Sequence, residues 1–541
     1  MIPGLTRGHG TADGAGHERF QQWALVAVVI TAMLAYANAL ANGFVLDDAP
    51  IVRTNPLVTS PGQAWRAFAM PYWPDRVGAG QYRPLGIVSF AIDWGISGGN
   101  PRWFHAVNVV WHALTTAAVW MLAAELMMPT AALIAALTFA VHPVHVEAVA
   151  NVVGRLECMA AVFAIGALIA HRRGHRSAPL WLALGVFSKE SAIVFIGLAA
   201  AHDVLLSENW RATLKARRWW YASYAVVVLV YAATLAAVFH DRALAIEARV
   251  LIGTTTLERL ALVARVIPQY ARLLLVPAEL SASYAPNVIM PDGGLSAGAV
   301  IGVAVLMLAA VAFVFAVRGR RWPVMAFAML WVPIALSPVS NVFFASGILL
   351  AERTLYLASV GVCLSLGAIA ERVLTSRRAP ALITIAVVLL AFTARTWTRT
   401  PVWRDDRTWL VTLLADHPES YEGHRTAGGI LKFAGQLDHA ERELTIAREL
   451  YPRDPLVYRE AADVALRQQR TQLAAALRDS AMLAPTLPLP RRSRCLSELP
   501  TGWACRAGTM GSTTPSRRLA RRSRIHARSA CSSRRLPWPS R

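Results

Sequence analysis

The sequence predicts an all-helical protein that crosses a membrane many times and carries a small helical repeat domain after its last crossing. Apolar residues make up 55% of the 541 residues and charged residues 16%, whereas soluble proteins average about 25% charged residues. The mean hydropathy is +0.41. About 11 to 12 apolar segments alternate with short polar loops up to residue 399, and a charged, alanine-rich pattern follows. These observations indicate a polytopic α-helical membrane protein.

Residues 1–22 form a polar, glycine-rich N-terminal segment, and the apolar run 23–41 follows without a small-residue cleavage site. We therefore expect 23–41 to be a retained transmembrane helix rather than a signal peptide. The run 260–276 contains Arg265 and Arg272, so we expect it to re-enter the membrane or lie on its surface. The other runs lie at 104–127, 130–142, 156–170, 179–187, 191–206, 221–239, 296–317, 323–338, 355–370 and 380–395.

Basic clusters between the runs predict the orientation, because loops rich in Lys and Arg stay in the cytoplasm. All four clusters can be cytoplasmic at once if the loop 42–103, the stretch 143–155 and everything after about residue 396 face outwards. We expect a protein of the bacterial inner membrane with these parts in the periplasm. The clusters are Arg172, Arg173 and Arg176; Arg211, Lys215, Arg217 and Arg218; Arg318, Arg320 and Arg321; and Arg372, Arg377 and Arg378.

Small apolar residues recur after residue 400 with the spacing of tetratricopeptide repeats. Ala440 and Ala447 are followed by Ala474 and Ala481, in each case 34 residues later. We therefore expect two such repeats within residues 400–486, packed on the membrane domain or truncated, since about three repeats are needed for independent stability. A plain helical hairpin is the alternative.

The net charge of +21 could indicate nucleic-acid binding, but its distribution argues against that class. Residues 487–541 hold 13 arginines, no lysine and one acid, Glu498. This tail has no apolar periodicity, so we expect it to be disordered. It is either a functional basic arm or the product of an out-of-frame gene ending, and the sequence leaves both interpretations open. The five cysteines show neither a disulfide framework nor a metal-finger spacing.

Two adjacent carboxylates, Asp47 and Asp48, follow the first apolar run. At a membrane exit such a pair can supply a general base together with an orienting or metal-binding partner. Capping of a short loop helix is the alternative, and it suits Asp48 better than Asp47. Arg83 lies in the same loop within the sequence YRPL. Arginine is a good bidentate ligand for phosphate, although an arginine beside a membrane also pairs with lipid headgroups.

Three further polar clusters fall on the same predicted side. The stretch HPVHVEAVANVVGR runs from His142 to Arg155 and lacks the His-Glu-x-x-His pattern of zinc proteases. We expect a loop whose imidazoles, Glu147 and Arg155 surround an anionic headgroup. The other two clusters place a cation beside a carboxylate, which salt-bridged helix ends would also explain. They are Ser188-Lys189-Glu190 and Glu352-Arg353-Thr354-Leu355-Tyr356.

The order of these motifs resembles the transmembrane and tetratricopeptide-repeat (TMTC-like) proteins. The resemblance covers roughly residues 23–486. It rests on FVLDD ending at Asp48, NP at Asn55, YRPL, HPVHVEAV with the later Gly-Arg, SKES, ERTLYLASVG, and W-x-DD ending at Asp406. These proteins stand among the polyprenyl-phosphate-sugar-dependent glycosyltransferases of the C-type fold, which include the protein O-mannosyltransferases.

The resemblance implies a transmembrane glycosyltransferase-like domain of the C-type fold over residues 23–399. It further implies that Asp47, with Asp48 beside it, deprotonates an acceptor hydroxyl, and that attack opposite the lipid phosphate inverts the anomeric centre. Preorganised cations would stabilise the charge that develops on the phosphate. The resemblance carries donor binding over to His142, His145, Glu147, Arg155, Glu352 and Arg353. The charged clusters described above add four more predicted donor-binding residues, Arg83, Lys189, Glu190 and Tyr356.

The implied reaction moves a sugar such as mannose from a polyprenyl-phosphate donor to a hydroxyl acceptor, with Ser or Thr of an exported protein as the first candidate. The implied partners are this donor, a protein or glycan acceptor and membrane lipids, and not nucleic acid. No cofactor is certain from the sequence, and a divalent metal is an open alternative. A lipid or glycan acceptor, and a non-catalytic scaffold whose repeats bind partners, are the rival hypotheses.

Overall fold

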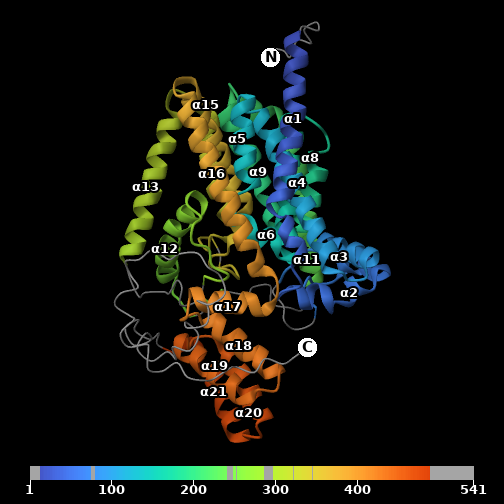
Figure 1. The fold of residues 1–541 in the computed structure, drawn as a ribbon, viewed down its shortest axis with the longest axis vertical. Helices are drawn as coiled ribbons and strands as arrows, with labels where there is room; N and C mark the ends of the chain where they lie inside the picture. Colours follow the sequence, from blue (N-terminus) through green and yellow to red (C-terminus); the bar gives the residue numbers. More distant parts are fainter. Residues whose placement is uncertain are drawn as a thin grey trace. The chain divides into compact units, whose positions relative to one another are not determined.

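The computed structural model describes residues 12–74, 80–240, 248–251, 253–284, 296–320, 322–343 and 345–487. Within these ranges all regular secondary structure is helical (Figure 1), which confirms the predicted fold class. The chain divides into two units, the first ending at Trp409 and the second beginning at Leu410. Residues 1–11 of the predicted N-terminal segment, and the predicted tail from 488 onwards, lie outside the described residues.

Seven of the described helices are long and apolar enough to cross a membrane. A span needs about 20 apolar residues at 1.5 Å per residue. Helix α13 shows what faces the lipid: Met307, Leu308 and Val311 are each more than 60% exposed, which suits contact with acyl chains rather than water. The seven spans contain α1 (Ala12–Ala35), α4 (Pro101–Ala124), α7 (Arg155–Arg172), α11 (Arg218–Val238), α13 (Ala297–Val317), α15 (Tyr356–Ser376) and α16 (Arg378–Arg399).

Shorter helices cover three further apolar runs; they are α8 (Ala178–Ser188), α9 (Phe195–Leu206) and α14 (Pro323–Leu336). Three other short helices lie in stretches that the sequence predicted as loops; they are α2 (Pro56–Thr59), α3 (Pro84–Ser97) and α10 (Trp210–Ala216). The predicted run 260–276 becomes α12 (Thr256–Leu275), which is not among the described helices apolar enough to cross. That this segment re-enters the membrane or lies on its surface stays a prediction.

The run 130–142 ends inside the protein at a break. Helix α5 (Pro129–Ala140) is followed by the 3₁₀ turn η4 (Pro143–His145) and the short helix α6 (Val146–Ala150), and the two directions differ by 44°. Pro143 begins η4, which fits the preference of proline for the first position of a helical turn. We had expected a loop over 143–155, but buried helical turns replace it.

The central helices pack closely. Helix α4 packs against α1, α5 and α7, and α15 packs against α5 and α14. On α15, Gly361 lets α14 approach, because a Cβ at this position would lie 2.5 Å from the carbonyl oxygen of Ala328. Such close backbone approach at small residues is typical of helix pairs in membranes.

The segment between α1 and α4 forms its own small core at one end of the bundle. Ile51, Val52 and Val58 pack with Phe90 of α3 and Leu156 of α7. Burial of these apolar side chains fixes the two segments that carry Asp47, Asp48 and Arg83 against the start of α7.

Members of all four basic clusters lie at the opposite end of the bundle, here called the basic end. Helices α7, α13 and α15 end there, and α11 begins there. Arg172 pairs with Glu125 after α4. Arg320 donates to the carbonyl oxygens of Ser207 and Glu208 after α9. The predicted orientation requires these clusters to share one end.

The second unit holds two antiparallel helix pairs. Each helix of the second pair begins 34 residues after its counterpart in the first pair, at Tyr421 and Pro455 and at Leu437 and Thr471. The recurring alanines are buried, so the periodicity in the sequence reflects packing. The helices are α18 (Tyr421–Phe433), α19 (Leu437–Leu450), α20 (Pro455–Arg467) and α21 (Thr471–Leu483).

The first unit extends to Trp409, ten residues beyond the boundary expected at 399/400. Residues 400–406 remain with the first unit because they bond to the segment after α1. Gly43 N donates to the carbonyl oxygen of Arg404 at 2.8 Å, and Asn42 Nδ2 donates to that of Thr400 at 3.2 Å. Helix α17 (Asp406–Asp416) follows this segment.

Candidate functional site

The two adjacent aspartates have different surroundings. Asp48 is fully buried, and both of its carboxylate oxygens accept backbone hydrogen bonds. Val45 N donates to Oδ2 and Val153 N donates to Oδ1, each at 2.9 Å. Asp48 therefore joins the segment after α1 to the turn before α7, whereas Asp47 is only partly buried. The sequence suggested that Asp48 caps a short helix within its own loop. In the structure Asp48 instead connects two segments that are distant in the chain.

Asp48 should make the protein less stable as the pH rises towards neutrality. Burial raises the pKa of Asp48 to about 7, although the hydrogen bonds from Val45 and Val153 lower it; the ordinary value is about 3.9. Between these two values the folded state keeps a proton that the unfolded chain loses. The contribution of Asp48 to the free energy of unfolding is therefore fully present below about pH 4 and is lost as the pH approaches about 7.

We expect the melting temperature of the purified protein in detergent to fall between about pH 5 and pH 7 in part through Asp48. Asp48→Asn should remove that part of the slope, while Asp405→Asn, at an exposed position, should leave it unchanged. An equally steep slope in Asp48→Asn would contradict the assignment.

Three cations of the site are each paired with a carboxylate that is distant in the sequence. Arg83 donates to Glu190 with two nitrogens, Nε at 2.8 Å from Oε2 and Nη2 to Oε1. Burial alone would raise the pKa of Glu190, but the charge of Arg83 outweighs it and the pKa is about 2. Glu190 is therefore ionised at physiological pH.

The other two pairs place the carboxylate behind the cation. Lys189 pairs with Glu157 of α7. Arg353 in the 3₁₀ turn η10 (Glu352–Leu355) pairs with Glu147 of α6, and its backbone N–H also donates to Glu147 at 2.9 Å. The side chain of Glu147 is 6% exposed and that of Arg353 26%, so the cation lies on the more open side of the pair.

Tyr72 connects Asp47 with the cations. The guanidinium of Arg83 lies over its ring, 5.2 Å from the centroid. Burial raises the pKa of the Tyr72 hydroxyl, Arg83 lowers it and Asp47 raises it, and Arg353 adds a lowering contribution. These charges are therefore close enough to act on one hydroxyl. Neither Tyr72 nor Glu157 was singled out from the sequence, because each lacks a charged neighbour in the chain.

Arg155 lies in the protein interior. Its guanidinium pairs with Asp93 of α3 at 2.5 Å, and its Nε donates to Asn108 at 2.7 Å. Asn108 in turn donates to the carbonyl oxygens of Val149 and of two residues in the following turn. Arg155 thus supports the turn whose Val153 holds Asp48. We had expected Arg155 to face a headgroup beside Glu147, but the guanidinium is fully buried.

His142, His145 and Tyr356 are also buried. His142 Nε2 lies 3.0 Å from the carbonyl oxygen of Leu274. The ring centroids of His145 and Tyr356 lie 4.6 Å apart, a pairing across the bundle that no sequence pattern predicted. Their contribution to donor binding stays a prediction.

Glu352 does not pair with its neighbour Arg353. Its Oε1 accepts hydrogen bonds from the backbone N–H of Ser281 at 2.8 Å and from the hydroxyl of Tyr284 at 2.7 Å. Glu352 therefore ties η10 to the segment after α12. Its role towards the donor also stays a prediction.

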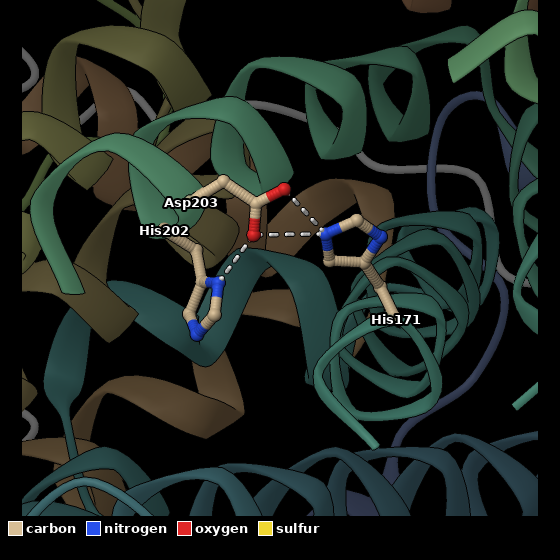
Figure 2. Close-up of side chains that lie close together, drawn as sticks. All are labelled: His171, His202 and Asp203. Carbon is tan, nitrogen blue, oxygen red and sulfur yellow. Dashed lines mark hydrogen bonds and ion pairs between the residues drawn. The ribbon is translucent and has the colours of Figure 1, made fainter. Parts of the chain in front are cut away.

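A separate polar cluster is formed by His171, His202 and Asp203 (Figure 2). It lies at the basic end of the bundle. Metal-ligand atoms of His171, His202 and Asp203 lie within 4.8 Å of one another. Arg217 Nη1, however, lies 2.6 Å from Asp203 Oδ1 and 2.8 Å from His171 Nε2, and Tyr221 donates to Oδ2 at 2.8 Å. The guanidinium thus stands where a metal would bind, and we interpret the cluster as a self-contained ionic network.

This network is also far from the aspartate pair. Helix α7 has 18 residues, or about 27 Å at 1.5 Å per residue, and it separates Arg155 at one end from His171 near the other. The cluster is therefore not the metal site that Asp47 and Asp48 suggested.

Fold and site together define a polytopic helical membrane protein with a carboxylate and three paired cations at one end of the bundle. Residues 94–237 match the family model for dolichyl-phosphate-mannose-protein mannosyltransferases. The matched stretch contains Glu147, Glu157, Lys189 and Glu190. No solved structure matches the chain.

Curated relatives bear names of the same kind. The chain is 24% identical to the Caenorhabditis elegans protein O-mannosyl-transferase F38B6.6 over 440 residues, which cover 79% of this chain and 63% of the relative. It is 26% identical to human protein O-mannosyl-transferase TMTC4 over 489 residues, 78% of this chain and 65% of the relative. Drosophila melanogaster Tmtc2 is 36% identical over 195 residues, 32% of this chain and 21% of the relative.

These matches confirm the resemblance to the TMTC-like proteins, because the family model and the similar proteins are all named for mannosyl transfer to protein. The chain spans less than two thirds of the length of each of these three relatives.

Proposed function

We propose that this protein transfers a sugar, with mannose as the first candidate, from a polyprenyl-phosphate donor to a Ser or Thr hydroxyl of an exported protein. The observation that carries the proposal is that Arg83 lies over the ring of Tyr72 and that the charges of Asp47, Arg83 and Arg353 all act on the pKa of its hydroxyl. A base and phosphate-binding cations in one place are what this transfer needs. The names of the relatives agree with it.

In the proposed reaction, Asp47 accepts the proton of the acceptor hydroxyl. The hydroxyl oxygen forms a bond to the anomeric carbon while the bond between that carbon and the phosphate oxygen breaks. The polyprenyl phosphate leaves with the electron pair, and attack from the side opposite the phosphate inverts the anomeric centre. The proton ends on Asp47, which passes it to water after the transfer, and the electron pair of the broken bond leaves with the phosphate.

The cations would act on the phosphate side. Arg83 and Arg353 present planar groups that match phosphate oxygens, and Lys189 adds a point charge. Their carboxylate partners hold them in place before the donor arrives, so little reorganisation is needed when charge develops on the leaving phosphate.

A divalent metal bound by Asp47 is an alternative way to activate the hydroxyl. Asp48 would have to give up its hydrogen bonds to Val45 or Val153 to take part as a ligand. Loss of transfer after chelation, restored by a divalent cation, would select this alternative.

The test is transfer of labelled mannose from polyprenyl-phosphate mannose by the purified full-length protein in detergent. Acceptors are a Ser/Thr-rich peptide, a lipid with a free hydroxyl, and a glycan. Label on the peptide would support the proposal. Label on the lipid or the glycan alone would mean that the acceptor is a lipid or a glycan rather than a protein. No transfer to any acceptor, with the donor bound, would favour the scaffold hypothesis.

We further propose that the site and the repeats face the periplasm. In intact cells Ser60→Cys and Ala415→Cys should react with an impermeant maleimide, whereas His175→Cys, exposed at the basic end, should be protected. Cys158 and Cys363 are buried, and Cys495, Cys505 and Cys531 would be replaced by serine beforehand. Labelling of His175→Cys with protection of Ser60→Cys would invert the orientation.

A further inference from the structure

Residues 397–406, here called the C-terminal strap, run along residues 38–46, which lead to the aspartate pair. Four hydrogen bonds connect the two segments although they are about 360 residues apart in the chain. The bonds run from Asn38 Nδ2 to Trp397 O (2.8 Å), from Asn42 Nδ2 to Thr400 O (3.2 Å), from Gly43 N to Arg404 O (2.8 Å) and from Leu46 N to Asp406 Oδ1 (2.7 Å).

The last of these bonds gives the two strap aspartates different roles. Asp405 Oδ1 accepts from the backbone N–H of Thr408 at 2.7 Å and so caps the start of α17. Asp406 instead reaches the backbone N–H of Leu46, the residue before Asp47. The two carboxylates therefore form a matched pair, adjacent and both exposed, of which one contacts the site segment.

The backbone at Leu46 needs support. Its φ angle is +49°, in the left-handed region that non-glycine residues adopt rarely. Such a conformation persists only where the surroundings fix it. Asp406 holds the N–H of Leu46 on one side of Asp47, and on the other side Asp48 is held by the N–H groups of Val45 and Val153.

We propose that Asp406 is a positioning residue that fixes the backbone at Leu46 and so aims the Asp47 carboxylate at the acceptor hydroxyl. The inference rests on the proposed function for the role of Asp47. The contact of Asp406 with the backbone N–H of Leu46, here called the clamp, can be tested separately through the order of the backbone at residues 43–48. Gly43 supports the same contact, because a Cβ there would lie 3.2 Å from the carbonyl oxygen of Arg404 and would press the strap away.

Asp406→Ala should lower kcat by about 10- to 100-fold, since a displacement of about 1 Å at a reacting group costs roughly that much. The KM for the donor should change by less than about twofold, because the phosphate-binding cations are untouched. Asp406→Asn keeps an oxygen that can accept the N–H of Leu46 and should recover most of the rate. Asp405→Ala, the matched control, should keep kcat within about twofold of wild type.

Hydrogen–deuterium exchange tests the clamp without reference to activity. In Asp406→Ala, peptides that cover residues 43–48 should exchange faster than in wild type by about tenfold or more, and in Asp405→Ala they should not. Exchange in α4 serves as the internal reference for intact folding.

The two readouts separate this inference from the proposed function. If the wild type shows no transfer but exchange at 43–48 rises only in Asp406→Ala, the function is wrong and the clamp stands. Wild-type kcat in Asp406→Ala, an equal loss in Asp405→Ala, or unchanged exchange at 43–48 would each overturn the positioning role.

Discussion

Replacing Asp47 with asparagine should lower sugar transfer by about 100-fold or more while donor binding survives. Asparagine keeps the size and one oxygen of the side chain but cannot accept the proton of the acceptor hydroxyl. The cations beside Asp47 remain, so the donor should still bind. Labelled transfer from polyprenyl-phosphate mannose, with donor binding measured in parallel, provides the measurement.

Asp48→Asn separates the two aspartates. Both oxygens of Asp48 accept backbone hydrogen bonds, so an amide nitrogen at one of them should disturb the segment and lower the melting temperature as well as the rate. Asp47→Asn should lower the rate with little change in melting temperature. Transfer by Asp47→Asn at the wild-type rate would remove the carboxylate from the mechanism and favour a scaffold.

Replacing Arg353 with alanine should raise the KM for the donor by about tenfold or more. A lost charge-assisted hydrogen bond to phosphate corresponds to about 1.5 to 3 kcal/mol. Arg353→Lys should recover only part of the affinity. The lysine ammonium restores the positive charge but cannot bind two phosphate oxygens as the planar guanidinium does. Kinetics at varied donor concentration, with peptide acceptor saturating, provide the measurement.

Arg353→Ala also leaves the buried carboxylate of Glu147 without this partner, which costs stability by itself. The double variant Glu147→Gln/Arg353→Met removes both charges and keeps the volume. It should restore the melting temperature but not the donor KM. Recovery of both in the double variant would mean that the pair only stabilises the fold.

The parts of this structure that depend on local periodicity could be predicted from the sequence. The 34-residue recurrence of Ala440 and Ala447 predicted the paired helices because both alanines are buried. The apolar runs predicted the long helices because positions that face lipid must be as apolar as positions that face the protein interior. The end of the apolar run at residue 142 was predicted, but the buried helical turns that follow it were not, since a proline within an apolar stretch fits either a kink or an end.

Ion-pair partners could not be predicted, because neighbours in the sequence do not face each other. Lys189 and Glu190 are adjacent, yet Lys189 pairs with Glu157 and Glu190 pairs with Arg83. The sequence located these charged residues and placed them on one side of the membrane. Their pairing depends on how α3, α7 and α8 pack, and that packing involves contacts across more than 100 residues.

The carboxylates that pair with the cations also bear on turnover. A site of unpaired arginines and lysine would hold the product polyprenyl phosphate as firmly as the donor, and strong binding of both species does not raise kcat. In the proposed reaction Glu147, Glu157 and Glu190 would compete with a bound phosphate for the same cations. Once the sugar had left, each cation could return to its carboxylate, which would release the spent lipid carrier for another round.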